Sequence, residues 1–325
     1  MKQSILIIIA LFLFSGNVLS QIFVHDPVIT QENDNYYLFC TGFGITQWSS
    51  PDMKNWTKEG PVFKETPQWV LESLTDFAGH MWAPDIIFHN DQYYLYYSVS
   101  AFGKNTSCIG VATNKTLDPD DPDYKWTDHG KVIQSVPGRD DWNAIDPAIA
   151  FDDDGQPWMS FGSFWNGLKL VKLNDDLTTI AQPEEWHTIA KRERSFDIEE
   201  TEAGDGAIEA PFIFKQNGYY YLFVSFDYCC RAAESTYKIM VGRAKNIEGP
   251  YLDKEGKSML TGGGSLVLKG NDNWYAIGHN AAYTFNGKDY LVCHGYDAHD
   301  NGRQKLIIRE MEWDNDGWPV VDQTK

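Results

Sequence analysis

Three acidic residues spaced along the chain, Asp26, Asp146 and Glu209, could together hydrolyse a bond between two sugars. Such hydrolysis needs a protonated carboxylic acid for the leaving oxygen and an ionised carboxylate for a water or for the sugar. A third carboxylate nearby can raise the pKa of the acid by like-charge repulsion. The same residues could equally bind a divalent cation or cap backbone groups, so their types alone leave these alternatives open.

Each of these acids stands at the head of a segment with the pattern of a β-hairpin. A short strand opens with a polar residue, usually beside Pro, and a turn rich in Asn, Asp and Gly leads to a strand dense in aromatic residues. These are the usual signals of a hairpin. Five such segments occur: HDPVITQENDNYYLFCTG (25–42), WAPDIIFHNDQYYLYYSVS (82–100), AIDPAIAFDDDGQPWMSFGSF (144–164), AIEAPFIFKQNGYYYLFVSFD (207–227) and IGHNAAYTFNGKDYLVCHGY (277–296).

The five hairpins define a repeated unit, and the repeat predicts the fold. Their polar heads are separated by 59, 61, 63 and 70 residues, and further strand candidates lie between them. A repeat of four strands is typical of a β-propeller. We therefore predict an all-β, single-domain, five-bladed β-propeller over residues 21–325, closed without a strand exchanged between the termini. The heads are Asp26, Asp85, Asp146, Glu209 and His279, and the further strand candidates are residues 108–114, 168–173, 237–244 and 305–313.

In a propeller the first strand of each blade lines the central channel, so the five heads should converge on one axis. Water in the channel would then solvate Glu209, which would be costly to bury in apolar packing. Asp26 and Glu209 both lie ten residues before the aromatic strand that follows them, whereas Asp85 lies only eight before its own. Asp85 should therefore lie two residues further along its strand, and we assign it a structural role.

The N-terminus and the net charge indicate where the protein acts and which partners it excludes. Residues 1–20 have a lysine, an apolar run and a small-residue cleavage site, which is the layout of a secretory signal peptide. No other stretch is long and apolar enough to span a membrane. The formal charge of −19 disfavours nucleic acid as a partner and is compatible with a neutral polymer or a cation. We expect a secreted or periplasmic protein that is a monomer and binds no membrane after signal removal.

The five cysteines are too few and too odd in number for a disulfide scaffold. Cys40, Cys108 and Cys293 lie in strand-like runs and are expected to be small core residues. Cys229 and Cys230 are adjacent, and a disulfide between them is a possible but strained alternative. We therefore expect reduced or heterogeneous thiols at these two positions.

An ordered series of motifs resembles glycoside hydrolase family 43 and, within it, the endo-1,5-α-L-arabinanases. The resemblance covers nearly the whole mature chain and rests on HDP (25–27), WAPD (82–85), WNAIDPAI (142–149), SFGSFWNGLKLVKL (160–173), AIEAPFI (207–213), FDYCCRAAESTYKIMVGR (226–243), GHN (278–280) and LVCHGYDAHDNG (291–302). It implies a five-bladed propeller that hydrolyses with inversion. Asp26 would be the general base, Glu209 the general acid, and Asp146 would tune that acid and orient the sugar. Inversion requires the base and the acid to stand roughly 6.5–9.5 Å apart.

The resemblance also implies a calcium ion in the channel, held by His279 and waters, with His294 as a second candidate ligand. One imidazole with several waters is an unusual set for calcium, which prefers oxygen, and a neutral histidine bonded at the channel floor is the alternative. His25 and His80 could line the funnel or be ordinary polar surface. The resemblance further implies sugar contacts, each of which could instead be inter-blade packing; they are Trp82, Phe102, Gly103, Asn143, Ser163, Phe164 and Trp165.

The function expected from this resemblance is secreted hydrolysis of internal α-1,5 bonds in arabinan, the side chain of pectin, with arabinan and arabino-oligosaccharides as partners. Two alternatives remain. An exo-acting α-L-arabinofuranosidase or β-xylosidase would use the same acids with one end of the cleft blocked. A non-catalytic, calcium-dependent sugar-binding propeller would need none of the three acids for turnover.

Overall fold

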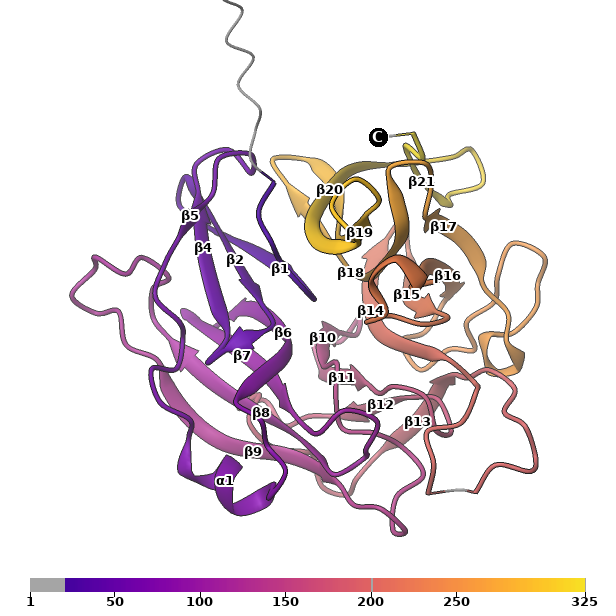
Figure 1. Cartoon of the computed structure of the whole chain (residues 1–325), viewed down its shortest axis with the longest axis horizontal. Coiled ribbons are helices and arrows are strands. Elements are labelled where there is room, and N and C mark those ends of the chain that lie inside the picture. The colour runs from indigo at the N-terminus through magenta and orange to yellow at the C-terminus, as the bar shows by residue number, and fades with distance from the viewer. Residues whose placement is uncertain (1–20, 200, 325) are drawn as a thin grey trace, which may run out of the picture.

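The computed structural model describes residues 21–199 and 201–324, and the predicted signal peptide of residues 1–20 lies outside this range. The strands form five sheets arranged around a common centre, as Figure 1 shows. Each sheet is one blade, and its first strand lies nearest the centre. The prediction of a single-domain, five-bladed β-propeller is confirmed. Within the described part of the chain, no helix has the length and apolar character needed to cross a membrane.

The blades follow one another along the chain, and each is an antiparallel meander. We number them one to five in chain order. Blade one contains β1 (Val28–Glu32), β2 (Asn35–Cys40), β4 (Thr46–Ser50) and β5 (Thr57–Lys58); blade two contains β6 (His80–His89), β7 (Gln92–Val99), β8 (Ser107–Asn114) and β9 (Thr127–Ser135), with β3 (Gly42–Phe43) paired to β6; blade three contains β10 (Ala148–Phe151), β11 (Pro157–Phe161), β12 (Leu168–Lys172) and β13 (Trp186–Ala190).

The last two blades have the same order of strands, and the helices are short connections between strands. Blade four contains β14 (Ile208–Gln216), β15 (Tyr219–Phe226), β16 (Lys238–Ala244) and β17 (Ser265–Lys269); blade five contains β18 (Trp274–Phe285), β19 (Lys288–Asp297), β20 (Arg303–Trp313) and β21 (Pro319–Val321); the helices are α1 (Gln68–Ser73), η1 (Ala232–Glu234) and η2 (Met259–Thr261).

The predicted hairpins form because their turn residues adopt left-handed backbone conformations. In four blades the inner hairpin closes with two residues, and the first of the two is an asparagine with φ between 49° and 53°: Asn33, Asn90, Asn217 and Asn286. Asparagine tolerates this region better than other residues with a side chain, and such turns match the twist of the strands they join. In blade three, residues 152–156 make the longer turn that the sequence DDDGQ indicates.

The core lies between blades, because each sheet packs on both faces against its neighbours. Every residue of β8 is buried, and so is every residue of β15 after the first. Aromatic rings make many of the contacts between blades. Phe39 of blade one meets Trp126 of blade two edge to face at 5.8 Å, and Phe214 of blade four stacks on Trp313 of blade five at 6.2 Å. Most of the aromatic residues are therefore core residues rather than sugar-binding surfaces.

The ring closes as predicted, with one addition. All four strands of blade five come from the C-terminal part of the chain, so no strand is exchanged. The N-terminal segment adds one bridge to this blade, where Phe23 pairs with Lys305 and the N–H of Leu306 donates to the carbonyl of Ile22 at 3.2 Å. This bridge joins the first and last blades immediately before Asp26.

Candidate active site

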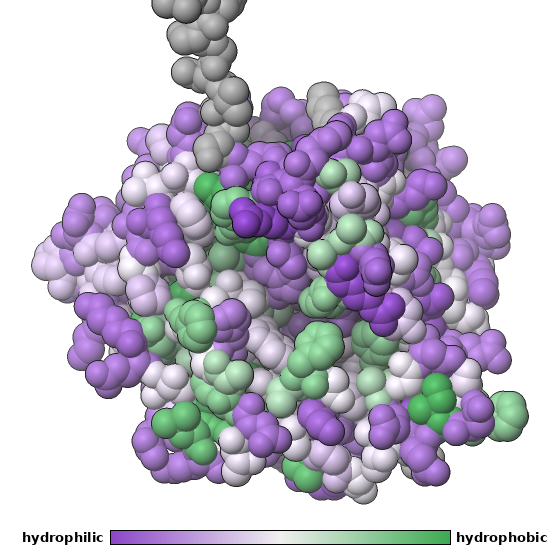
Figure 2. All heavy atoms as spheres, viewed as in Figure 1, coloured by the Kyte–Doolittle hydropathy of each residue, from purple (hydrophilic) through white to green (hydrophobic). Residues whose placement is uncertain are grey.

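The inner strand of every blade is kinked near its head by one residue in the left-handed region. For a residue other than glycine this conformation costs about 1–3 kcal/mol, and residues that adopt it are common at functional sites. The kinks place the heads of the strands around one centre, and Figure 2 shows that this face is hollowed near its middle, where hydrophilic residues are flanked by hydrophobic ones. The kinked residues, with φ between 43° and 59°, are Asp26, Ala83, Asp146, Ala210 and His279.

Side chains of the preceding blade hold four of these kinks. Each kinked N–H donates to a side chain that lies fifteen residues beyond the kink of the preceding blade, at the same place in the repeat. These bonds run from Ala83 to Thr41 Oγ1 (2.9 Å), from Asp146 to Ser98 Oγ (3.0 Å), from His279 to Ser225 Oγ (2.8 Å) and from Asp26 to His294 Nδ1 (3.1 Å). The centre of the propeller is thus built from contacts between blades.

The kink at Ala210 is held differently. In blade three the pairing of β10 with β11 places Gly162 opposite the kink, sixteen residues beyond Asp146 instead of fifteen, because this hairpin is one residue longer. The N–H of Gly162 donates to the carbonyl of Ile145, and Gly162 has no side chain to accept a bond. The N–H of Ala210 donates instead to Oδ2 of Asp146, at 3.1 Å. Asp146 therefore holds the backbone immediately after Glu209.

The kinks also show that the five predicted heads do not all occupy equivalent positions in their blades. Glu209 precedes the kink of its strand by one residue, so it is not equivalent to Asp26, although both lie ten residues before an aromatic strand. The strand pairings explain the offset: Tyr219 corresponds to Asn35, because each is the first residue after a two-residue turn, and Tyr36 corresponds to Tyr220, which lies ten residues after the kink at Ala210. Asp85 lies two residues beyond the kink at Ala83, as predicted.

Asp85 has the structural environment that we expected. It is 2% exposed, and its Oδ2 accepts from the N–H of Ile149 on β10 at 2.8 Å. Burial raises the pKa of Asp85 to about 7, against the opposing effect of that hydrogen bond and of one from the N–H of Ile86. This carboxyl joins blades two and three.

Asp26 accepts several hydrogen bonds and is held as a carboxylate. Thr41 Oγ1 donates to its Oδ2 at 2.6 Å, and His25 Nδ1 lies 2.8 Å from the same oxygen. His279 Nδ1 lies 3.0 Å from Oδ1. Burial alone would raise the pKa of Asp26, but His25 and then His279 favour the charged form and hold the pKa far below its ordinary value.

The three histidines around Asp26 differ in charge. Burial lowers the pKa values of His279 and His294, and the partial compensation from Asp26 does not restore them. Burial also opposes the charge on His25, but the attraction of Asp26 and the bond to it win, so the pKa of His25 is raised. Of the three histidines, His25 therefore has the strongest preference for the protonated form.

Glu209 is a buried carboxyl with a raised pKa. It is 8% exposed, Ser163 Oγ donates to its Oε2 at 2.6 Å, and the hydroxyl of Tyr237 donates to its Oε1. Burial raises its pKa, and the charge of Asp26 adds to the increase, although the bonds from Ser163 and Tyr237 act in the opposite direction. A carboxyl in this position retains its proton to higher pH than a carboxyl in water.

Asp146 shares this behaviour and is linked to Glu209. Its pKa is raised well above the ordinary value by burial, then by the charges of Glu209 and Asp26, although the N–H of Ala210 favours the charged form. Because Asp146 and Glu209 repel each other when both are ionised, the pair holds a proton more firmly than either carboxyl would alone. The site thus combines one carboxyl with a lowered pKa, Asp26, and a pair of carboxyls with raised pKa values.

Two of the expected sugar-contact residues adjoin Glu209. Ser163 bonds its carboxyl directly, and the N–H of Phe164 donates to the carbonyl of Ile208 at 2.8 Å. Trp165 is 4% exposed, and its indole N–H has no hydrogen-bond partner. It lines a cavity of about 570 Å³ together with Lys191 and Arg194. An unpaired indole N–H at a cavity is compatible with a polar ligand group.

The remaining expected contacts lie in blade two and at the entry to blade three. Trp82 is half-buried on β6, and Asn143 is 4% exposed with its Oδ1 accepting from Ser107 Oγ at 2.6 Å. Phe102 and Gly103 are exposed on the β7–β8 loop, and Phe102 is 78% exposed. Outside this set, His80 packs on Phe43 at the exposed end of β6.

The residues near the channel fit calcium only as an ion that keeps most of its water. His279 contributes imidazole nitrogen, and a tight group of ligand atoms within 4.8 Å of one another consists of His25, Asp26 and His294. Calcium takes six to eight oxygen ligands, whereas this set is rich in nitrogen. Asn280, beside His279, is 3% exposed and its amide oxygen and nitrogen lack partners. This buried amide could therefore take a water or an ion as its partner.

Sequence reasoning missed two hydroxyl groups that bond the carboxylates. Tyr237 bonds Glu209, and Thr41 bonds both Asp26 and the kink at Ala83. Thr41 has a detectable signal, since Ser98, Ser225 and His294 occupy the same place in the repeat. Nothing in the sequence distinguishes Tyr237, because it is one of many tyrosines beside a strand.

The expectation of reduced thiols at Cys229 and Cys230 is wrong, since the structure joins them in a disulfide. They lie in the turn between β15 and β16, where Cys230 adopts a left-handed conformation with φ of 64°. This turn brings neighbouring side chains together, a geometry that sequence spacing did not indicate. The other three cysteines are free and buried, as expected.

Comparison with known proteins agrees with this geometry. The family model described as glycosyl hydrolases family 43 matches residues 15–319. An extracellular exo-α-(1→5)-L-arabinofuranosidase of Cellvibrio japonicus is 59% identical over 93% of this chain and 87% of its own length. An extracellular endo-α-(1→5)-L-arabinanase of Bacillus subtilis is 44% identical over 91% of this chain and 87% of its own length.

A solved structure gives the same result. An α-L-arabinanase of Cellvibrio cellulosa in complex with arabinohexaose superposes with a TM-score of 0.92 at 59% identity, covering 93% of this chain and 96% of that one.

Proposed function

The chain belongs to glycosyl hydrolase family 43, and on that basis we propose that it is a secreted enzyme that hydrolyses α-1,5-L-arabinofuranosidic bonds in arabinan. The observation that carries the proposal is the convergence of Asp26, Asp146 and Glu209 with opposite protonation behaviour. One carboxyl has a strongly lowered pKa and a neighbouring carboxyl has a raised pKa, which is the difference that hydrolysis of a glycosidic bond needs. The relatives described as extracellular support secretion.

In the proposed mechanism Asp26 is the general base and activates the attacking water. Its carboxylate is fixed by Thr41, His25 and His279, so it is oriented before substrate binds. A carboxylate with so low a pKa is a weak base towards free water. The water becomes acidic as its oxygen bonds the electron-poor anomeric carbon, so Asp26 can accept the proton at that stage.

Glu209 is the general acid and donates its proton to the departing sugar oxygen. Its raised pKa favours the protonated form, and Ser163 and Tyr237 fix the orientation of its carboxyl. Asp146 supports this role in two ways. The two carboxyls repel each other when both are ionised, so the pair retains a proton, and the bond from Ala210 to Asp146 holds the backbone next to the acid. With a water between base and acid, the anomeric configuration would invert.

The mode of attack that the sequence predicts is cleavage of internal bonds. A second candidate is exo-attack, and the specific observation in its favour is that the relative at 59% identity is described as an exo-acting arabinofuranosidase, against 44% for an endo-arabinanase. Digestion of linear, debranched arabinan separates the two. Mixed oligosaccharides early in the reaction support endo-attack, whereas a single short product from the first minutes onward supports exo-attack.

We also propose that the channel holds one calcium ion. His279 would be the protein ligand nearest the centre, with Asn280 and water around the ion. Bound there, a divalent cation would add positive charge beside Asp26 and stabilise its ionised form. The buried, unpartnered amide of Asn280 supports the proposal.

A further inference from the structure

The loop between β15 and β16, residues 227–237, passes from the blade of Glu209 toward that of Asp26. Its two ends are fixed to each other, because Thr236 N–H donates to the carbonyl of Tyr228 at 2.9 Å. Arg231 N–H donates to Ser235 Oγ at 3.0 Å, and the Arg231 guanidinium lies over the Tyr228 ring at 4.0 Å. The loop also packs closely on Gly302, where an added Cβ would lie 2.5 Å from backbone atoms of the loop. It is therefore a rigid element.

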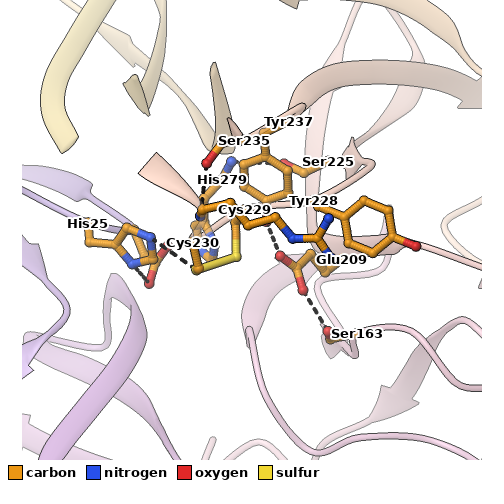
Figure 3. Close-up of a disulfide and its surroundings, with 12 residues drawn as sticks. His25, Ser163, Glu209, Ser225, Tyr228, Cys229, Cys230, Ser235, Tyr237 and His279 are labelled. Atoms are coloured by element: carbon orange, nitrogen blue, oxygen red, sulfur yellow. Dashed lines mark hydrogen bonds and ion pairs between the residues drawn. A yellow bond between two sulfur atoms is a disulfide. The ribbon is translucent and has the colours of Figure 1, made fainter. Parts of the chain in front are cut away.

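The disulfide of Cys229 and Cys230 lies in this loop and reaches His25. The N–H of Cys230 donates to the hydroxyl oxygen of Tyr296 at 2.7 Å, and that oxygen lies 3.4 Å from His25 Nε2. Cys230 Sγ lies 3.8 Å from the same nitrogen. In Figure 3 the disulfide stands between His25 and Glu209. The disulfide fixes the position of Cys230. It thereby fixes the two groups that lie near His25 Nε2, which are Cys230 Sγ and the Tyr296 hydroxyl.

The opposite edge of the imidazole faces Asp26, with Nδ1 2.8 Å from Oδ2. The His294 ring lies beside it with the ring centroids 4.2 Å apart, and Glu209 is the next carboxyl that acts on it. His25 is thus held between the carboxylate and the disulfide loop. The His25 side chain is 25% exposed, so without its contacts at Nε2 the ring would be free to turn away from Asp26.

We propose that the Cys229–Cys230 disulfide is a positioning element for the hydrolytic reaction, which holds His25 against Asp26 so that the carboxylate keeps its orientation toward the attacking water. The inference rests on the proposed function, in which Asp26 is the general base. Neither cysteine bonds one of the three acids, so the disulfide acts on the site through His25 and Tyr296.

Reduction of the folded enzyme tests the proposal, because the pair forms the one disulfide of the described chain, which includes all five cysteines. Dithiothreitol would reduce the bond to two thiols and become a cyclic disulfide. Burial raises the pKa values of Cys40, Cys108 and Cys293 to about 12, 11 and 12, so these thiols stay unreactive at neutral pH. Alkylation followed by mass spectrometry of the peptides then verifies that reduction produced new thiols only at Cys229 and Cys230.

The expected result is a fall in kcat on linear arabino-oligosaccharides of between about tenfold and a hundredfold, with KM nearly unchanged, as for a reacting group displaced by about 1 Å. Reoxidation with oxidised glutathione should restore kcat. A Cys229→Ser/Cys230→Ser variant should match the reduced enzyme and ignore dithiothreitol. If that variant does not fold, the reduced wild type, checked by circular dichroism, still decides.

His25→Ala supplies the second test. If the disulfide acts through His25, reduction should cause no further loss of kcat in this variant, because the two changes remove one interaction. Unchanged kcat on reduction of the wild type would overturn the proposal, and so would a rise in KM alone, which would make the disulfide a surface for sugar binding. So would a loss seen with arabinan but not with an arabino-oligosaccharide carrying a nitrophenyl leaving group, because the effect would then pass through Tyr237 and the acid. A wild type that never hydrolyses arabinan would refute the proposed function itself.

Discussion

The backbone N–H of Ala210 donates to Oδ2 of Asp146 at 3.1 Å, across the boundary between blades four and three. In the other blades a side chain of the second strand holds the corresponding kink, but here that position is Gly162. Asp146 thus replaces a structural hydroxyl and fixes the residue that follows Glu209. Asp146 therefore affects both the position of Glu209 and its protonation.

The two contributions of Asp146 can be separated by substitution. Asp146→Asn keeps an oxygen that can accept from Ala210, while Asp146→Ala does not. Both variants lose the carboxyl with which Glu209 shares a firmly held proton, so the alkaline limb of the kcat/KM profile should move to lower pH. The Ala variant should lose about tenfold more kcat, as expected for one hydrogen bond. Equal losses in the two variants would show that the bond has no part in activity.

Glu209→Gln should remove the proton that the leaving group needs. The amide fits the same space and can still meet Ser163 and Tyr237, so we expect normal folding and binding of arabino-oligosaccharides. Turnover of arabinan should fall by about 10²–10⁴-fold. A nitrophenyl glycoside, whose leaving group needs no proton, should lose far less. Full retention of turnover would contradict the assignment, and absence of turnover in the wild type would favour a sugar-binding propeller.

Asp85→Asn should change the pH dependence of stability. The pKa of Asp85 is raised to about 7 in the folded protein from an ordinary 3.8, so between about pH 4 and pH 7 the folded state keeps a proton that the unfolded chain has lost. Stability then falls as pH rises through this range. An asparagine cannot ionise, so the variant should gain roughly 4 kcal/mol relative to the wild type between pH 4 and pH 8.

Thermal unfolding of both proteins at several pH values measures the Asp85 effect. Asp120→Asn, a change of the same kind on an exposed loop, is the matched control and should leave the pH dependence as it is. A constant difference in Tm between the Asp85 variant and the wild type at all pH values would contradict the prediction.

Removal of calcium should destabilise the enzyme if the proposed channel ion is present. An ion that binds the folded state alone raises Tm by mass action. We expect a chelator to lower Tm and kcat, and calcium to restore both better than magnesium, which demands a stricter octahedral geometry. His279→Ala should abolish the response to the chelator. A wild type that the chelator leaves unaffected would refute the calcium site.

Much of the fold could be predicted from local patterns. The repeated polar head, the Asn- or Gly-containing turn and the aromatic strand define each inner hairpin, and the turn at Asn217 and Gly218 has the left-handed angles that this pair favours. The number of units gave the number of blades. These features are predictable because a hairpin is fixed by residues within about twenty positions of one another.

The geometry of the centre was only partly predictable. Asp26, Asp146 and Glu209 were identified from their motifs, but their protonation behaviour depends on His25, Tyr237 and one another, which are distant in sequence. The disulfide was mispredicted for the same reason, because the shape of its turn is set by packing on Gly302. The offset between Glu209 and Asp26 arose because the count for Glu209 ended at Tyr219, which corresponds to Asn35 in the first hairpin and not to Tyr36.

The sequence by itself determined the all-β repeat, the order of the motifs and the identities of the three acids, because each of these is written in short stretches of chain. The tertiary structure alone decided which carboxyl is ionised and which is protonated. That choice depends on burial and on charges brought within a few ångströms from different blades, and no local pattern encodes such distances.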